Sequence, residues 1–241
     1  MNRIDAIILD WAGTTVDYGS FAPVNAFIAA FEAFGIKASI EETRAPMGLP
    51  KLKHIEKMLE NMGRSYTQED VGKIYAHFEP ALFEVLGKHA DPLPGVIEAA
   101  QQIREMGVAI GSTTGYTQAM MNVVVPLAKE KGYAPDCVIC PDDCRGVGRP
   151  YPYMIWHNLE KLGIASIHNV LKIGDTEVDM QEGKNAGCIC VGILKGSSML
   201  ALNGSEKISR QKYMKAGADY VIEDIGALPA LIKSLNQKGG V

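Results

Sequence analysis

Short, continuous runs of apolar residues, rich in Ile and Val, alternate along most of the chain with longer segments of mixed polarity. Such runs are typical of strands in a parallel sheet that helices cover on both faces. The predicted strands cover residues 4–10, 108–113, 137–140, 170–175, 188–194 and 220–224. The predicted helices between them cover residues 95–106, 116–131, 152–162 and 176–186, and a glycine follows each one. The repeated strand–helix order predicts an α/β fold with a doubly wound, Rossmann-like parallel sheet.

One interval, residues 20–94, carries only helical patterns. Helices are expected over 22–34, from a capping box at Ser39 and Glu42, over 51–62 and over 68–87, before the break "DPLPG" at 91–95. We expect this interval to form a helical cap domain, with residues 1–19 and 95–241 forming the α/β core. The cap would lie over the carboxyl edge of the sheet, where open α/β sheets bind ligands.

Composition excludes several classes of function. The chain has 241 residues, 47% of them hydrophobic, with a net charge of -4, and this balance gives no broad cationic face for nucleic acid or anionic lipid. The stretch "MNRIDAIILDWAG" has too few apolar residues for a signal-peptide core, and no stretch reaches the roughly 18 apolar residues of a membrane span. We expect a cytoplasmic protein with no nucleic-acid or membrane partner.

Five cysteines raise the question of a metal site. Cys137, Cys140 and Cys144 lie close together, but three thiols without a nearby histidine are an incomplete zinc set. Cys188 and Cys190 alternate within a predicted strand. Buried thiols in a reducing compartment are therefore the favoured interpretation. Nothing after residue 195 is diagnostic, and the terminal "NQKGGV" is expected to be flexible.

The ends of four predicted strands carry residues suited to phosphoryl chemistry. They are Asp10, then Ser112, Thr113 and Thr114, then Arg149, and finally Asp175 with Asp179. Carboxylates from two strands suit Mg²⁺, hydroxyl and backbone N–H groups suit phosphate oxygens, and a guanidinium neutralises the remaining charge. Each residue alone is as easily a helix cap, a turn or a surface residue. Four strand ends with complementary groups at one edge favour a phosphoryl-transfer site.

These four motifs, with a helical insertion after the first, resemble those of the haloacid dehalogenase superfamily. The resemblance implies that Asp10 is a nucleophile that forms an aspartyl-phosphate. It also implies that Mg²⁺ is held by Asp10, the backbone carbonyl of Ala12 and Asp175, with Asp179 as a supporting partner. Among the three hydroxyl residues 112–114, the choice of Thr114 as the phosphate contact comes from the resemblance, because strand register leaves it open.

Ala12 departs from the usual pattern, because phosphatases and mutases of the superfamily usually place an aspartate there as a general acid. The predicted cap contains "RAPMGLPKLKH" (44–54), which brings Lys51 near a helix start. Together with "DWAGTTVDYG", "GSTTGYT", "GRPYP" and "GDT", this segment closely resembles the phosphonoacetaldehyde hydrolase (phosphonatase) branch, whose distinguishing residue is the lysine. The resemblance also implies a homodimer formed through cap helices.

The chemistry of a P–C bond explains why Ala12 and Lys51 occur together. Heterolysis would leave a carbanion, and protonating an oxygen does not prevent this. If Lys51 condenses with an aldehyde, the resulting imine can accept the bonding electrons and leave as an enamine while Asp10 attacks phosphorus. Such a lysine needs a lowered pKa and therefore a desolvated pocket.

Other residues of the same segments are candidates for completing the pocket. Met47 is expected to exclude water. His54 lies three residues after Lys51 on the same helical face and is a candidate proton relay or an ordinary surface residue. Tyr116 is a candidate for lining the pocket or for packing. Cap closure over hinges at 18–22 and 91–95 would bring Lys51 to Asp10.

Three alternatives stay open. A Mg²⁺-dependent phosphate-monoester phosphatase or mutase fits the core motifs but leaves Ala12 and Lys51 unexplained. A dehalogenase fits less well, because the phosphate and Mg²⁺ groups are present. A non-catalytic binding protein would explain Ala12 by loss but predicts decay elsewhere in the site. The favoured hypothesis is hydrolysis of phosphonoacetaldehyde, a small phosphonate, to acetaldehyde and phosphate.

Overall fold

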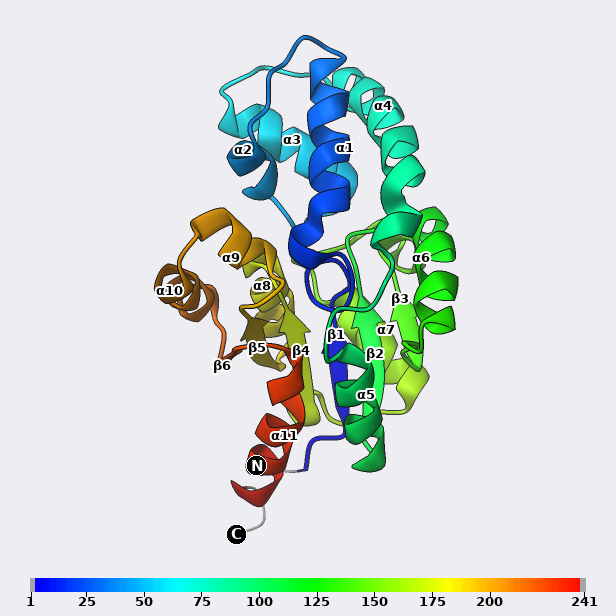
Figure 1. Cartoon of the computed structure of the whole chain (residues 1–241), viewed down its shortest axis with the longest axis vertical. Coiled ribbons are helices and arrows are strands. Elements are labelled where there is room, and N and C mark those ends of the chain that lie inside the picture. The colour runs from blue at the N-terminus through cyan, green and yellow to red at the C-terminus, as the bar shows by residue number, and fades with distance from the viewer. Residues whose placement is uncertain (1–2, 239–241) are drawn as a thin grey trace.

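Six parallel strands form one sheet in the computed structural model, which describes residues 3–238 (Figure 1). They are β1 (Ala6–Leu9), β2 (Ala109–Thr113), β3 (Cys137–Ile139), β4 (Val170–Gly174), β5 (Ile189–Ile193) and β6 (Tyr220–Ile222). Their order across the sheet is β3-β2-β1-β4-β5-β6. The strands that follow β1 are added on one side of it and those that follow β4 on the other, so the switch point lies between β1 and β4. Open α/β sheets bind ligands at such a switch point. The predicted strands and the predicted fold class are confirmed.

Helices cover both faces of the sheet, and the alternation of side chains along β1 shows how. Ile7 and Leu9 belong to the large core shared with α5 (Val96–Glu105), α6 (Gln118–Glu130) and α11 (Leu228–Lys238). Ala6 and Ile8 pack on the opposite face, against α7 (Tyr153–Leu162) and α8 (Glu177–Ala186). Because both faces of β1 are buried, its sequence reads as continuously apolar.

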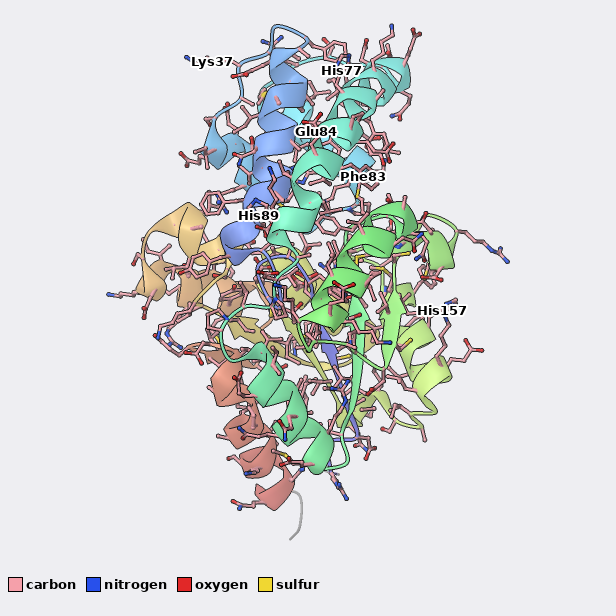
Figure 2. The ribbon with its side chains drawn as sticks, turned by 45° about the vertical axis from the view of Figure 1, so that its right-hand side comes forward. Lys37, His77, Phe83, Glu84, His89 and His157 are labelled. Carbon is pink, nitrogen blue, oxygen red and sulfur yellow. The ribbon has the colours of Figure 1, made fainter. Side chains whose placement is uncertain are left out.

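The segment between β1 and α5 is helical, as predicted. It contains η1 (Tyr18–Ser20), α1 (Phe21–Glu32), α2 (Ile40–Arg44), α3 (Lys51–Asn61), α4 (Gln68–Leu86) and η2 (Gly87–His89). Phe27 of α1 stacks on Phe78 of α4 with ring centroids 4.1 Å apart, and the predicted capping box of Ser39 and Glu42 begins α2. These helices stand beyond the carboxyl ends of β1, β2 and β4, and Lys37 and His77 lie at their far end (Figures 1 and 2).

Three helices in the last part of the chain have no counterpart in the sequence analysis: α9 (Ser198–Asn203), α10 (Glu206–Ala216) and α11. Tyr213 of α10 is fully buried, and its hydroxyl lies 2.8 Å from the carbonyl oxygen of Asp175 and 2.7 Å from that of Ile193. α10 therefore supports the loop that follows β4. Of the terminal "NQKGGV", residues 236–238 belong to α11, and residues 239–241 lie outside the described part.

Two adjacent connections join the helical segment to the sheet. The N–H of Leu93 donates to the carbonyl of Thr15 at 2.8 Å, and an antiparallel bridge pairs Val16 with Pro92. Beside them, Nδ1 of His89 lies 3.0 Å from a carboxylate oxygen of Asp17. His89 ends η2, which follows α4 on the side nearest the sheet (Figure 2). The outgoing and returning chains are therefore tied together a few residues from Asp10.

The five cysteines are free and buried, as the sequence predicts. None of the described helices is long and apolar enough to cross a membrane.

Candidate active site

The loops after β1, β2 and β4 bring the predicted site residues to one place. β1 pairs in parallel register with β2 on one side and β4 on the other, so the three strands end at the same edge. Asp10 follows β1, Thr114 follows β2 and Asp175 follows β4. All three are nearly inaccessible to solvent. Parallel pairing is the reason that residues about 60 to 160 positions apart in the chain become neighbours.

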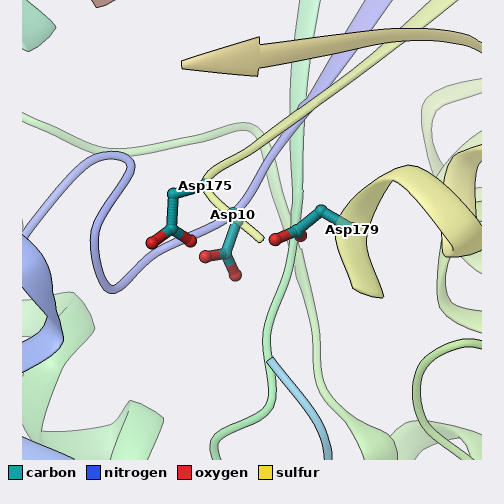
Figure 3. A group of neighbouring side chains, drawn as sticks. All are labelled: Asp10, Asp175 and Asp179. Carbon is teal, nitrogen blue, oxygen red and sulfur yellow. The ribbon is translucent and has the colours of Figure 1, made fainter. Parts of the chain in front are cut away.

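Three carboxylates form the centre of this edge. Asp10, Asp175 and Asp179 each offer an oxygen within 4.8 Å of the others, and their carboxylates point toward a common space (Figure 3). Burial raises the pKa of Asp10 and of Asp175, and repulsion between the carboxylates adds to the effect. Gly13, in the left-handed region at φ 86°, lets the backbone approach Asp175 so closely that a Cβ there would overlap its carboxylate.

This cluster fits a divalent cation. Oδ2 of Asp175 accepts a hydrogen bond from the N–H of Ser198 at 2.7 Å, but Oδ1 is buried without a partner among the described residues. Four buried carboxylates, Asp10, Asp175, Asp179 and Glu182, gather here, with Arg149, Lys172 and Lys51 as nearby buried cations. The carboxylates outnumber these cations, and carboxylate oxygen is the preferred protein ligand of Mg²⁺.

Arg149 reaches into the site from the loop after β3. Its Nη2 lies 2.6 Å from Oδ1 of Asp10, its Nη1 lies 3.0 Å from Oδ1 of Asp179, and its Nε lies 3.0 Å from Oε2 of Glu182. Nη2 also donates to the backbone carbonyl of Thr113 at 2.8 Å. Although burial opposes it, these carboxylates hold the pKa of Arg149 above its usual range, so the guanidinium stays charged.

The three hydroxyl residues at the end of β2 face different surroundings. Ser112 Oγ donates to the carbonyl of Cys137 at 3.1 Å, and Thr113 Oγ1 donates to Glu182 at 3.0 Å. Thr114 lines the cavity beside Asp10, and its Oγ1 accepts the N–H of Tyr116 at 3.0 Å. Of the three, Thr114 is the one that lines the same cavity as Asp10.

Lys51 comes from the helical segment, at the first residue of α3, and faces this cluster. The side chain is 5% exposed, and Nζ lies 4.6 Å from the ring centroid of Tyr116 and 5.8 Å from that of Phe27. In residues 3–238 no carboxylate forms an ion pair with it. Burial lowers the pKa of Lys51 to about 8; Asp10 opposes this shift and Arg149 adds to it. A substantial fraction of the amine is therefore neutral near physiological pH.

His54 lies behind Lys51 and is not part of the cavity wall. Its ring is fully buried and stacks on Phe27 at 3.9 Å, and Nε2 is 2.9 Å from the carbonyl of Thr43. Burial, with a smaller effect of Lys51, holds the pKa of His54 well below its usual range. Nδ1 is buried without a hydrogen-bond partner among the described residues. The interpretation of His54 as a cap-surface residue is wrong, because it is in the interior.

The cavity is enclosed by both parts of the chain. Asp10, Ala12, Thr114, Arg149 and Asp175 line it from the sheet, and Met47, Gly48 and Lys51 line it from the helical segment, with Tyr116 beside Lys51. Its volume of about 20 Å³ is close to that of one water molecule. A phosphonate with two carbon atoms is larger than this volume.

Gly48 lies where the helical segment contacts the loops at the edge of the sheet. Its φ of 94° is in the left-handed region, and a Cβ there would lie 2.6 Å from Oγ1 of Thr176. On the opposite side, a Cβ on Gly115 would lie 2.9 Å from the carbonyl oxygen of Leu49. The loop 46–50 is thus inserted between the loop after β2 and the start of α8.

Comparisons with known proteins agree with this geometry. The family model for haloacid dehalogenase-like hydrolases matches residues 4–187. A phosphonoacetaldehyde hydrolase of Bacteroides fragilis (strain YCH46) is 44% identical over an alignment of 261 positions, gaps included, which covers 99% of each chain. The chain belongs to the phosphonoacetaldehyde hydrolase family of haloacid dehalogenase-like hydrolases.

Two further relatives show how much of each protein the similarity covers. A bifunctional phosphonoacetaldehyde hydrolase/aminoethylphosphonate transaminase of Clostridioides difficile (strain 630) is 43% identical, and the alignment covers 98% of this chain but 41% of that protein. This chain thus spans about two fifths of that relative. The crystal structure of a phosphonoacetaldehyde hydrolase-like protein from Oleispira antarctica matches with a TM-score of 0.91 and 31% identity, covering 98% of this chain and 94% of that one.

Sequence reasoning missed three residues that hold this family's site in place. Lys172 and Glu182 are fully buried beside Arg149, and the N–H of Ser198 bonds Asp175. Ser197 and Ser198, followed by an apolar run, are a recognisable helix start. A single lysine inside the apolar run "VLKIGD" was the signal for Lys172, since an isolated charge in a buried strand requires partners.

Proposed function

We propose that this chain hydrolyses the P–C bond of phosphonoacetaldehyde to acetaldehyde and phosphate. The observation that carries the proposal is the buried amine of Lys51, with its lowered pKa, on the wall of the same small cavity as Asp10. The names of the full-length relatives support the substrate. Ala12 supports it too, because a leaving group that departs as an enamine needs no acid at that position.

The reaction begins at Lys51. The neutral amine adds to the aldehyde carbon, and loss of water gives a protonated imine. The rings of Tyr116 and Phe27 and the side chain of Met47 exclude bulk water from this step. His54 does not line the cavity, but it lies on the same helix as Lys51 and its Nδ1 has no hydrogen-bond partner among the described residues, so it is the candidate for relaying protons during imine formation.

The second step belongs to Asp10. A carboxylate oxygen attacks phosphorus and the P–C bond breaks. Its electron pair forms a C=C bond while the C=N π pair moves onto the nitrogen of Lys51, so that an enamine remains on Lys51. Arg149 and Thr114 orient the phosphonate oxygens and neutralise their charge. Protonation of the enamine carbon and addition of water release acetaldehyde and the amine. A second water cleaves the aspartyl-phosphate, which releases phosphate and restores Asp10.

Mg²⁺ is the cofactor we assign to the acidic cluster. Asp10, Asp175 and the carbonyl of Ala12 would hold it, and Asp179, fixed by Arg149, would support them. When bound, the cation supplies charge neutralisation that lets the Asp10 carboxylate approach an anionic phosphonate.

The helical segment 20–94 is, in this proposal, a cap domain on a core formed by residues 1–19 and 95–241. It opens about the tied connections near Val16 and Pro92 to admit substrate. We further propose that the enzyme works as a cytoplasmic homodimer joined through cap helices; sedimentation measures the assembly.

One assay tests the function. The protein is incubated with phosphonoacetaldehyde and, separately, with p-nitrophenyl phosphate, with and without Mg²⁺, and acetaldehyde and phosphate are measured. We expect Mg²⁺-dependent release of both products from the phosphonate. Lys51→Arg should abolish acetaldehyde release and imine trapping by borohydride, and Asp10→Asn should block phosphate release. Lys53→Arg is the matched control, because Lys53 is exposed on the same helix and pairs with Glu56.

The outcomes separate the alternatives. Phosphate from the ester alone would establish a phosphatase and refute the proposal. Full P–C cleavage by Lys51→Arg would refute the imine mechanism, and binding of either compound without turnover would favour a non-catalytic protein.

A further inference from the structure

Lys172 is a buried lysine that the proposed mechanism does not use. It lies on β4, inside the sheet, with no solvent exposure. Nζ donates to Oγ1 of Thr113 at 2.8 Å and lies 3.0 Å from Oδ1 of Asp179 and 3.1 Å from Oε2 of Glu182. An apolar side chain of similar size would fill this position without burying a charge, so stability alone does not explain the lysine.

Glu182 is its counterpart on α8 and is also fully buried. One oxygen, Oε2, meets Nε of Arg149, Nζ of Lys172 and the hydroxyl of Thr113. Gly183 makes this possible, because a Cβ there would lie 2.9 Å from Cβ of Lys172 and would push α8 away from β4.

The contacts of Arg149 show what this pair does. Its guanidinium is planar, and Glu182 binds Nε, so the direction of the other two nitrogens is fixed. Nη1 then faces Asp179 and Nη2 faces Asp10. Neither Lys172 nor Glu182 lines the cavity, so any effect on the reaction passes through their neighbours.

The charges explain why two cations are needed. Asp179 and Glu182 together are neutralised by Lys172 and Arg149. Without Lys172, Arg149 would be the single cation between these two carboxylates and would be drawn toward them, away from Asp10. With Lys172 present, Nη2 remains directed at the nucleophile and at the phosphonate it receives.

We propose that Lys172 and Glu182 are positioning residues, which hold the Arg149 guanidinium in the orientation that serves phosphoryl transfer to Asp10. The inference rests on the proposed function. It separates the two halves of the reaction, because Arg149 does not contact the bonds that form and break when Lys51 makes the imine, whereas it orients the phosphonate oxygens during transfer from carbon to Asp10.

The test compares Lys172→Met, Glu182→Gln and the double variant with the wild type. We expect each to lower kcat for acetaldehyde release at least tenfold, while the rate of borohydride trapping at Lys51 stays within twofold. The double variant removes both charges, so it should regain the wild-type Tm but not the wild-type kcat. Lys184→Met is the matched control on the same helix, since Lys184 forms an exposed pair with Asp219 at 2.8 Å, and its kcat should not change.

Several results would overturn the inference. They are a double variant with full kcat, a parallel loss of trapping and turnover, or a crystal structure of Glu182→Gln in which Nη2 of Arg149 still faces Asp10. The crystal structure also decides the question if the single variants are unstable or if the wild type releases no acetaldehyde. In that last case the proposed function fails by itself, whereas active wild type with equally active variants refutes only the positioning role.

Discussion

Replacing Lys51 by Met should change how stability depends on pH. Met keeps the apolar stem between Tyr116 and Phe27 but carries no charge. In the folded protein the pKa of Lys51 is about 8, against 10.5 for an ordinary lysine. Between these two values the folded state therefore binds fewer protons than the unfolded chain. The contribution of Lys51 to the free energy of unfolding rises as pH increases from 8 to 10.5 and falls as pH decreases.

The size of the effect follows from the two pKa values. This difference in pKa lowers the free energy of unfolding by about 3 kcal/mol at low pH, and most of this penalty is present at pH 7. Between pH 7 and pH 10 the penalty falls by about 2.5 kcal/mol. The free energy of unfolding of the wild type, minus that of Lys51→Met, should rise by this amount.

Urea denaturation of both proteins at pH 7, 8, 9 and 10 in EDTA measures the difference. The titration of all other groups is common to the two proteins and cancels to a first approximation. Lys53→Met, at an exposed position of the same helix, is the control for loss of a lysine from this helix. A pH-independent difference for Lys51→Met would mean that the amine is not desolvated, and the argument for its reactivity would fail.

Three further outcomes are expected. Gly48→Ala should cost about 1–3 kcal/mol of stability, measured by urea denaturation, and raise KM, because it combines a left-handed φ with a clash at Thr176. Ala12→Asp should lower acetaldehyde release about tenfold at pH 7 and less at pH 9, because a new carboxylate raises the pKa of Lys51; an equal loss at both pH values would contradict this. Mg²⁺ should raise the Tm of the wild type but not that of Asp175→Asn, by calorimetry, since the cation relieves repulsion within the carboxylate cluster.

The sequence predicts the sheet and most of its helices because each element carries its own signal. Continuous apolar runs mark buried strands, and glycines such as Gly163 and Gly187 end helices in the left-handed conformation. α10 has a helix start at Ser205 and an end at Gly217, but its mostly polar surface hides the pattern, since only Ser209 and Tyr213 are buried. Weak periodicity is the reason that it was missed.

The site is predictable only in part for a different reason. Strand ends identify Asp10, Asp175 and the group of hydroxyl residues 112–114, because parallel pairing brings them together whatever the details of packing. Within that group, the choice of Thr114 came from the family resemblance. The contacts of Lys172 with Thr113 and Glu182 depend on the close approach of α8 to β4, which is a tertiary property. The burial of His54 under Phe27 likewise depends on how α1 packs against α3, so the sequence left its environment open.

In the proposed opening of the helical segment, the tied connections beside the sheet would determine how far Lys51 and Asp10 each move. The hydrogen bond between Leu93 and Thr15 and the bridge between Val16 and Pro92 lie within a few residues of Asp10, so a rotation about them has its axis close to the nucleophile. Points near an axis barely move, whereas Lys51, at the start of a more distant helix, travels along an arc. In the proposed cycle the amine of Lys51 would therefore move away and return, while the acidic cluster keeps its geometry.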